Sequence, residues 1–330
     1  MLELLTNKIF LWTAFNVFVL AMLALDLGVF HRHAHKVSIK EALFWTVVWT
    51  VLTLLFGVAL YFMRGTTIAL QFLTGFLIER ALSVDNLFVF LLIFSYFAVD
   101  AKYQHKVLIW GILGALVMRA AMIVLGVALI TAFHWVLYIF GGFLIITGIK
   151  MGLQKEGEMH PERNIIVRLA QRIFPVTRQY HNGKFFIRLD GRRMATPLFI
   201  VVVAIEVSDL VFAVDSIPAI FAVTTDPFIV YTSNVFAILG LRALYFALAG
   251  VMNIFVHLKY GLAIILSLIG VKMVLMDIFP IPIGVALGVV AGVIAISILT
   301  SIIWPPRLAP APVAGQADPP GTAPTSPDIS

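Results

Sequence analysis

The chain has 330 residues, of which 61% are hydrophobic and only 12% are charged, and its mean hydropathy is +1.03. This composition is too apolar for a soluble domain, so it indicates an integral membrane protein. The absence of cysteine excludes structural disulfides, thiolate metal ligands and dithiol redox chemistry. A net charge of +6 would suit nucleic-acid binding in a soluble protein, but in a membrane protein basic residues set orientation, so we expect no nucleic-acid partner.

Apolar stretches of about 20 residues, each long enough to cross ~30 Å of hydrocarbon as a helix, recur along the chain. They lack the alternation of a membrane β-barrel, so we expect an all-α, polytopic helical membrane protein. We expect the first stretch to be a retained helix, since it is too long for a secretory signal and has no small-residue cleavage site. The nine predicted spans are residues 8–30, 41–63, 68–97, 107–133, 135–152, 197–223, 228–253, 260–279 and 283–304.

The basic residues of the connecting segments fall mostly on one side of the membrane if the N-terminus lies outside. The inward segments then hold Arg32, Lys36, Lys40, Lys102, Lys106, Lys259, Arg307 and a basic loop at 153–196. This asymmetry predicts an outer N-terminus and a cytoplasmic C-terminus. We expect a transmembrane domain over residues 1–304 and, because of its Pro, Ala, Gly and Thr content, a disordered tail over 305–330.

The loop at 153–196 contains two patterns. Its first part predicts a short amphipathic helix that carries four basic residues, Arg163, Arg168, Arg172 and Arg178. Its second part, "GKFFIRLDGRR", alternates like a hairpin with a turn at Asp190-Gly191. We expect the loop to fix topology and to contact anionic membrane lipid; docking of partner proteins or regulation is the alternative.

An internal repeat relates the two halves of the membrane domain, at about 68–152 and 197–279. The segment "ERALSVDN" at 79–86 aligns with "DLVFAVDS" at 209–216, and Arg119 aligns with Arg242 in the next span of each half. By the predicted topology the two acid-bearing spans run in opposite directions. Such an inverted repeat is typical of transporters that bind their substrate near the midplane, between the repeats.

Five carboxylates lie within two of these apolar spans, where a charged side chain costs about 2.5–3.5 kcal/mol on insertion scales. They are Glu79, Asp85, Glu206, Asp209 and Asp215. Pro218 is expected to kink or open its helix beside Asp215 and to free backbone carbonyls. With the side-chain oxygens of Asn86 and Ser216, these groups predict a site for a hard cation such as Mn²⁺, Mg²⁺ or Ca²⁺.

A structural role is the alternative explanation of these acids, since they could pair with Arg80, Arg119 and Arg242. Five acids against three arginines still leave at least two negative charges that need a cation or a proton. Asp26 is a further candidate ligand, and it could equally sit at the interface, as could Asp277 and Lys272. Thr225 and Asn234 are expected to shape the outer turn between the sixth and seventh spans.

Three long motifs resemble the TerC family of bacterial membrane proteins: "IERALSVDNLFVF", "AIEVSDLVFAVDSIPAI" and "TTDPFIVYTSNVFAILGLRALYF". The segment "GKFFIRLDGRRMATPLF" is most similar to the Alx-like branch of that family. The resemblance implies a bacterial inner-membrane protein related to tellurium resistance and to manganese export. It also implies that six residues handle the metal: Glu79, Asp85, Asn86, Asp209, Asp215 and Ser216.

Together these features predict an inner-membrane divalent cation transporter, with manganese efflux as the leading activity. We expect the metal to be a substrate, with no permanently bound cofactor and no enzymatic activity. The alternative is a membrane scaffold or metal and tellurite stress-resistance component that does not transport and that docks partners through its basic loop. A membrane redox enzyme is disfavoured, since the spans offer neither cysteine nor a paired histidine set for haem.

Overall fold

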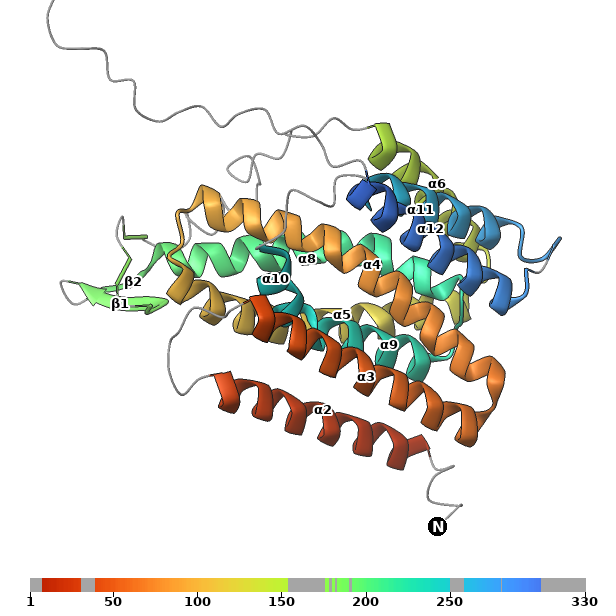
Figure 1. Cartoon of the computed structure of the whole chain (residues 1–330), viewed down its shortest axis with the longest axis horizontal. Helices are drawn as coiled ribbons and strands as arrows, with labels where there is room; N and C mark the ends of the chain where they lie inside the picture. Colours follow the sequence, from red (N-terminus) through yellow and green to blue (C-terminus); the bar gives the residue numbers. More distant parts are fainter. Residues whose placement is uncertain are drawn as a thin grey trace, which may run out of the picture.

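The computed structural model describes residues 8–30, 39–153, 176–177, 180–181, 183–189, 192–249, 258–279 and 281–303. The side chains of residues 8, 25–30, 85, 88, 192 and 258 lie outside this description, although their backbone is assigned. Most of the long helices run along the long axis of the molecule, as expected for a membrane bundle (Figure 1). A small two-stranded sheet projects from one end of this bundle, which we call the hairpin end.

The helices begin and end close to the predicted spans. They are α2 (Lys8–Phe30), α3 (Ile39–Arg64), α4 (Thr66–Tyr96), α5 (Ala101–Ala132), α6 (Val136–Leu153), α8 (Pro197–Phe221), α9 (Pro227–Leu239), α10 (Leu241–Ala249), α11 (Leu258–Val274) and α12 (Ile283–Ile303).

Within the described residues, six helical segments are long and apolar enough to cross a membrane, with α9 and α10 counted together. A shorter apolar helix covers Ile9–Ala24 in α2. Helix α4 carries charged residues near its middle, and α11 has only 17 residues. The polytopic helical fold is therefore confirmed, whereas nine membrane crossings stay a prediction.

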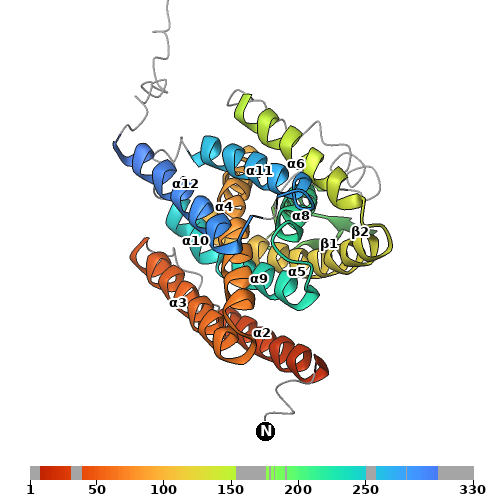
Figure 2. The same cartoon turned by 90° about the vertical axis from the view of Figure 1, so that its right-hand side faces the viewer.

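Four helices, α4, α5, α8 and α9, form the centre of the bundle (Figure 2). Helices α2 and α3 lie on one side of this centre, and α6 and α11 lie on the opposite side. Helices α5 and α8 run in the same direction, since Gly111 faces Ile205 and, further along both helices, Gly126 faces Phe221. Helix α4 runs against α8, as predicted (Figure 1).

Three apolar clusters make up the core, and they meet at the middle of α4, α5 and α8. One joins the far halves of α5 and α8 to α6 and α11. A second joins the hairpin-end halves of α4, α5 and α8 to α10. The third joins α2, α3 and α9 to the first half of α4. A polar group at their junction is therefore surrounded by apolar side chains on every side.

The hairpin predicted in the basic loop is confirmed. Strand β1 (Phe186–Leu189) pairs antiparallel with β2 (Arg192–Ala195), and the Leu189↔Arg192 pair leaves two residues between the strands. The predicted amphipathic helix with its four arginines lies mostly in residues 154–175, outside the described part, as does the tail at 305–330.

The segment that leads into the hairpin is fastened to the ends of two central helices. Lys106 Nζ donates to the Gly183 carbonyl at 2.6 Å and lies over the Phe185 ring. The Tyr180 hydroxyl donates to the Phe97 carbonyl at 2.6 Å, and burial raises the pKa of Tyr180, which keeps this donor protonated. The hairpin end is thus held against α4 and α5.

Candidate cation site

The guanidinium of Arg119, near the midpoint of α5, is the centre of a buried polar cluster. Its Nε donates to Asp209 Oδ2 at 3.1 Å, and its Nη2 donates to Asp209 Oδ1 at 2.9 Å. Asp209 is the middle residue of α8. This two-pronged contact matches the planar guanidinium to the carboxylate, and it joins α5 to α8 at mid-depth.

The remaining side of the guanidinium reaches α4 and α9. Arg119 Nη1 forms an ion pair with Glu79 Oε1. The same nitrogen donates to Asn234 Oδ1 at 2.8 Å and approaches Ser216 Oγ at 3.4 Å. We call Arg119, Glu79, Asp209, Ser216 and Asn234 the Arg119 cluster. It brings together the first acid of each sequence repeat, which are Glu79 and Asp209.

The charges within the Arg119 cluster do not balance. Two carboxylates share one guanidinium, and all three groups are almost completely buried. Glu79 Oε2 is buried and accepts no hydrogen bond from the residues that the structure describes. A buried carboxylate oxygen without a donor is costly, so this atom is a position at which a cation or a proton would be stabilised.

Glu206 adds a further carboxylate beside the cluster. It lies three residues before Asp209 on α8, is half-buried, and interacts electrostatically with Asp209. Its carboxylate packs against α5 at Gly114, where an added Cβ would collide with it. Gly114 therefore creates the space that lets this side chain lie between the two helices.

The predicted grouping of Asp215 with the other acids differs from the structure. Asp215 is half-buried and faces α6, where it lies near the Thr147 hydroxyl and the positive charge of Lys150. It stands six residues from Asp209, which places the two side chains on different sides of a regular helix. They would have come together only if α8 opened at Pro218.

The expected opening of α8 at Pro218 is not formed. The helix is continuous through this residue and ends three residues later, at Phe221. Proline removes a single backbone donor here, and the surrounding residues from Ser216 to Phe221 are all buried, so packing maintains the helix. The Val214 carbonyl, four residues before Pro218, therefore lacks its usual helical donor, but the helix does not open further beside Asp215.

The three predicted charge-pairing arginines have different roles. Arg119 pairs with two acids, as described. Arg80 instead donates to the Ala237 carbonyl at 3.1 Å, and its guanidinium packs against Gly240, where α9 ends and α10 begins. A cation at the C-terminal end of a helix satisfies exposed carbonyls and complements the helix dipole. Arg242 is buried within α10.

Of the other predicted ligands, Asn86 is buried in α4 and Ser216 belongs to the Arg119 cluster. Asp85 in α4 and Asp26 in α2 have side chains outside the described part, so their predicted roles stay predictions. In the described residues, no group of three or more His, Asp or Glu side chains is arranged to hold a metal ion. Arg119 lies between Glu79 and Asp209, where a shared metal would have to bind.

Two members of the site escaped the sequence-based prediction. Asn234 was expected to shape an outer turn, yet it lies inside α9 and accepts from Arg119. The sequence offers one indication of this role, which is that Asn234 is a polar amide within an apolar span. Gly114 contributes to the site because it leaves room for the Glu206 carboxylate of α8. A single sequence holds no sign of that contact.

Comparison with known proteins shows which family the chain belongs to. The sequence profile of the integral membrane protein TerC family matches residues 64–307. An uncharacterized membrane protein of Myxococcus xanthus is 53% identical over 293 residues, which cover 89% of this chain and 92% of the relative. An Escherichia coli K12 protein named "Putative membrane-bound redox modulator Alx" is 51% identical over 286 residues, covering 84% of this chain and 89% of the relative.

A more distant relative is an uncharacterized membrane protein of Rickettsia bellii, 41% identical over 292 residues, which cover 88% of this chain and 97% of the relative. No solved structure matches the chain significantly. The match to the family profile spans every member of the Arg119 cluster, and the identity to the curated relatives extends over most of both chains. The chain therefore belongs to the TerC family of integral membrane proteins, in the branch that includes the Alx proteins.

Proposed function

We propose that this protein is a multi-pass transporter of the bacterial inner membrane that moves divalent metal cations, with Mn²⁺ as its substrate. The observation that carries the proposal is the Arg119 cluster, in which Glu79 and Asp209 from two long helices share one guanidinium at mid-depth. A transported cation needs a buried, negatively charged, oxygen-rich site that can also release it. Carboxylate, amide and hydroxyl oxygens suit Mn²⁺ in both respects.

The charge imbalance supports transport over a purely structural role. A buried network that only holds helices together is most stable when every polar atom has a partner. Here Glu79 Oε2 has none among the described residues, and the half-buried carboxyl group of Glu206 lies nearby. In the proposed cycle, Arg119 serves as an internal counter-ion, and an incoming cation or a proton replaces it at the carboxylates.

The packing of α6 against α11 supports the proposed inverted repeat. The two helices carry the similar segments "GIKM" at 148–151 and "GVKM" at 270–273. A Cβ added at Gly148 would meet the Ala263 carbonyl at 2.7 Å and the Ser267 nitrogen at 2.8 Å.

The reciprocal contact has the same form. A Cβ added at Gly270 would meet the Gly141 carbonyl at 2.6 Å and the Ile145 nitrogen at 2.9 Å. Gly148 thus faces residues 263 and 267, which stand seven and three positions before Gly270. Gly270 faces residues 141 and 145, which stand seven and three positions before Gly148. This reciprocity is what a two-fold axis between the halves requires, and such an axis favours alternating access around a central site.

The proposed orientation places the hairpin end in the cytoplasm and the N-terminus outside. Lys102, Lys106, Lys184, Arg188 and Arg193 all lie at or near the hairpin end of the described chain. A concentration of basic residues at one end favours its cytoplasmic location. Export as the direction of transport rests on the resemblance to the family alone.

Flux of Mn²⁺ into liposomes that contain the purified protein tests the proposal, measured with and without a pH gradient. We expect flux from the wild type and its loss in Glu79→Gln and Asp209→Asn. The matched control is Asp100→Asn, which removes an exposed carboxylate that pairs only with Lys102 among the described residues. Equal flux in all four proteins, or none in the wild type, would refute the transport function.

A scaffold that docks partners is the second candidate, and the hairpin favours it. Phe186 and Leu189 are about half exposed there, next to the exposed Arg188 and Arg193. A docking scaffold would lose its function on deletion of residues 183–195 and keep it in Asp209→Asn. A transporter would instead lose its function in Asp209→Asn.

The name of the Escherichia coli relative suggests a redox role as another candidate. With no cysteine, the chain has no thiol of its own to exchange with a disulfide. A redox effect of the protein would therefore act through the metal that it moves. It should disappear together with Mn²⁺ flux in Glu79→Gln.

A further inference from the structure

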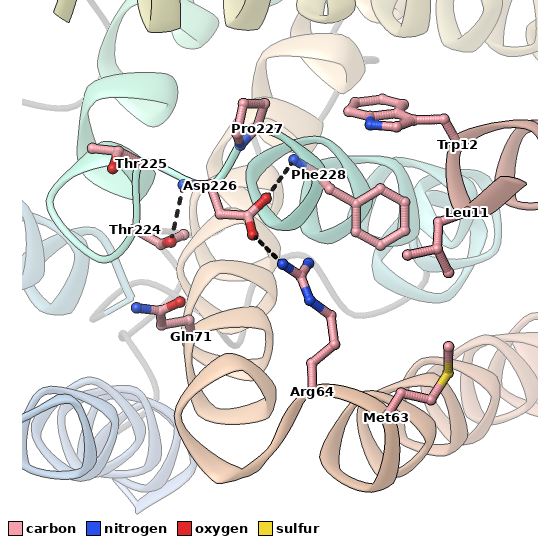
Figure 3. Close-up of a pocket in the computed structure, with 10 residues that line it drawn as sticks. All are labelled: Leu11, Trp12, Met63, Arg64, Gln71, Thr224, Thr225, Asp226, Pro227 and Phe228. Carbon is pink, nitrogen blue, oxygen red and sulfur yellow. Dashed lines mark hydrogen bonds and ion pairs between the residues drawn. The ribbon is translucent and has the colours of Figure 1, made fainter. Parts of the chain in front are cut away.

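A cavity of about 640 Å³ (Figure 3) lies by the turn between α3 and α4, at the end of the bundle opposite the hairpin (Figure 1). It opens where α3 turns into α4 and where α8 connects to α9. Its polar lining comes from Arg64, Gln71, Thr224, Thr225 and Asp226. The rest of the wall is formed by apolar side chains of α2, α3 and α9. The cavity is separate from the Arg119 cluster.

The carboxylate of Asp226 organises the polar side of this cavity. It forms an ion pair with Arg64 at 3.0 Å and accepts from the Phe228 backbone N–H at 2.9 Å, which caps α9 (Figure 3). The Asp226 backbone N–H donates to Thr224 Oγ1 at 3.2 Å. Across the cavity, Gln71 Oε1 is buried and has no hydrogen-bond partner in the part of the chain that the structure describes.

These groups suit a cation better than an anion. Carboxylate, amide and hydroxyl oxygens are hard ligands for a divalent cation. An anion would find only Arg64, whose charge Asp226 already neutralises. A water molecule takes about 30 Å³ in the liquid, so the cavity has room for a cation that keeps several of its waters.

The cavity lies on the line that leads to the Arg119 cluster. Gln71, Gly75 and Glu79 follow one another on successive turns of α4, and ~12 Å of helix separates the first from the last. Between them Gly75 packs closely against Ser233 and Ile220, both fully buried. The route from the cavity to Glu79 is therefore closed by close packing at Gly75.

We propose that this cavity is the outer vestibule of the cation path, where a partly hydrated divalent cation binds Asp226 together with oxygens of Gln71 and Thr224. This inference rests on the proposed transport function. Arg64 holds the place of the cation at Asp226 and moves aside when the cation arrives. Its side chain is one-third exposed and it ends α3, so it can turn toward water without moving a helix.

Titration of the purified full-length protein with Mn²⁺, with the bound ion counted by electron paramagnetic resonance, tests the vestibule through two opposite effects. Asp226→Asn should weaken one class of Mn²⁺ sites about tenfold or more, since it removes a charged ligand. Asparagine also caps helices well, so α9 should stay intact, which thermal unfolding checks. Arg64→Gln should strengthen the same sites several-fold, because it removes the competing cation.

Opposite changes of Mn²⁺ affinity in Asp226→Asn and Arg64→Gln distinguish a cation-binding site from a structural ion pair. A merely structural pair would weaken binding in both variants or change it in neither, and either result would overturn the inference. Asp100→Asn and Lys102→Gln, which break an exposed ion pair at the hairpin end, serve as matched controls and should leave binding unchanged. Binding of inorganic phosphate that depends on Arg64 would identify an anion site and would also overturn it.

Flux in the same preparations separates this inference from the proposed function. If Glu79→Gln abolishes Mn²⁺ flux while Asp226→Asn and Arg64→Gln leave binding unaltered, the vestibule is wrong and transport stands. If the wild type shows no flux but binding changes in opposite directions in the two variants, the cavity stands as a cation site and transport is wrong.

Discussion

At the scale of single residues, the arrangement around Arg119 shows how an apolar chain can accommodate several charges. Each carboxylate in α4 or α8 would be expensive in hydrocarbon if it stood alone. Arg119 lowers that cost for Glu79 and Asp209 together, and Asn234 and Ser216 complete its hydrogen bonds. Among the described residues, Glu79 Oε2 is then left without a donor, which links the stability of the cluster to the binding of a cation or a proton.

Replacement of Arg119 by methionine should therefore be strongly destabilising. It would leave two buried carboxylates without their cation, and the loss of one partner of a buried ion pair costs about 3–5 kcal/mol. Thermal unfolding of the detergent-solubilised protein measures the effect. Lys102→Met, which removes an exposed cation, is the control, and equal unfolding temperatures for the two variants would contradict this account.

Gly114→Leu should reduce Mn²⁺ flux sharply. The added side chain would occupy the position of the Glu206 carboxylate between α5 and α8. The same change at Gly142 in α6 is the matched control, since nothing lies within 4 Å of a Cβ added there. Flux assays on equal amounts of folded protein measure the difference. Similar losses in both variants would mean that the position of Glu206 does not matter.

Much of the candidate site could be predicted at this scale because charge inside an apolar span is costly and therefore conspicuous. That argument found Glu79, Asp209, Glu206 and Arg119 without any structure. It could not predict which side chains pair, since this depends on how helices far apart in the sequence cross. Asp215 shows the difficulty, because its predicted place depended on a break in α8 that packing prevents.

At the scale of elements, the close contact of α6 and α11 is a feature that hydropathy alone does not reveal. Both helices are apolar over most of their length, so their pattern predicts a membrane helix but not a partner. The glycines at 148 and 270 let the two backbones approach each other, which is how small residues drive helix pairing in membranes.

Leucine at Gly148 and leucine at Gly270 should destabilise the protein to a similar extent, about 1–3 kcal/mol or more, through overpacking. Gly288→Leu on α12 is the control, because nothing lies within 4 Å of a Cβ at that position. Thermal unfolding of the three variants provides the test. Destabilisation by only one of the first two would argue against the reciprocal contact and weaken the proposed two-fold relation.

The elements themselves could be predicted well from the chain. Runs of apolar residues gave helix positions to within a few residues over most of the bundle, and alternation with Asp190-Gly191 gave the hairpin. The division of the seventh predicted span into α9 and α10 could not be predicted. It occurs at Gly240, against which the Arg80 guanidinium packs, and the contact joins residues from opposite halves of the chain.

At the scale of the whole molecule, the two ends of the bundle differ in chemistry. The β-hairpin lies at one end (Figure 1), where Lys106, Arg188 and Arg193 also lie, and the cavity with Arg64 and Asp226 lies at the other (Figure 3). The proposed orientation places the end with the basic residues in the cytoplasm. The Arg119 cluster lies between the two ends, as a site with alternating access would.

Cysteine labelling tests the orientation directly, since the chain has no native cysteine to remove. A cysteine in place of Asp100, near the hairpin end, should react with a membrane-impermeant maleimide only in inverted vesicles. A cysteine in place of His134, beyond the far end of α5, should react in intact spheroplasts. Labelling of both positions from the same side would exclude the proposed topology.

The ion pairs of the Arg119 cluster also have a consequence for biosynthesis. Glu79 and Arg119 lie on the adjacent helices α4 and α5, so they can pair as soon as these two have left the ribosome. Asp209 is made 90 residues after its partner Arg119. The N-terminal half can therefore enter the membrane with Glu79 and Arg119 already paired, whereas α8 depends on an arginine that is already in place. The order of synthesis thus makes the first half a template for the insertion of the second.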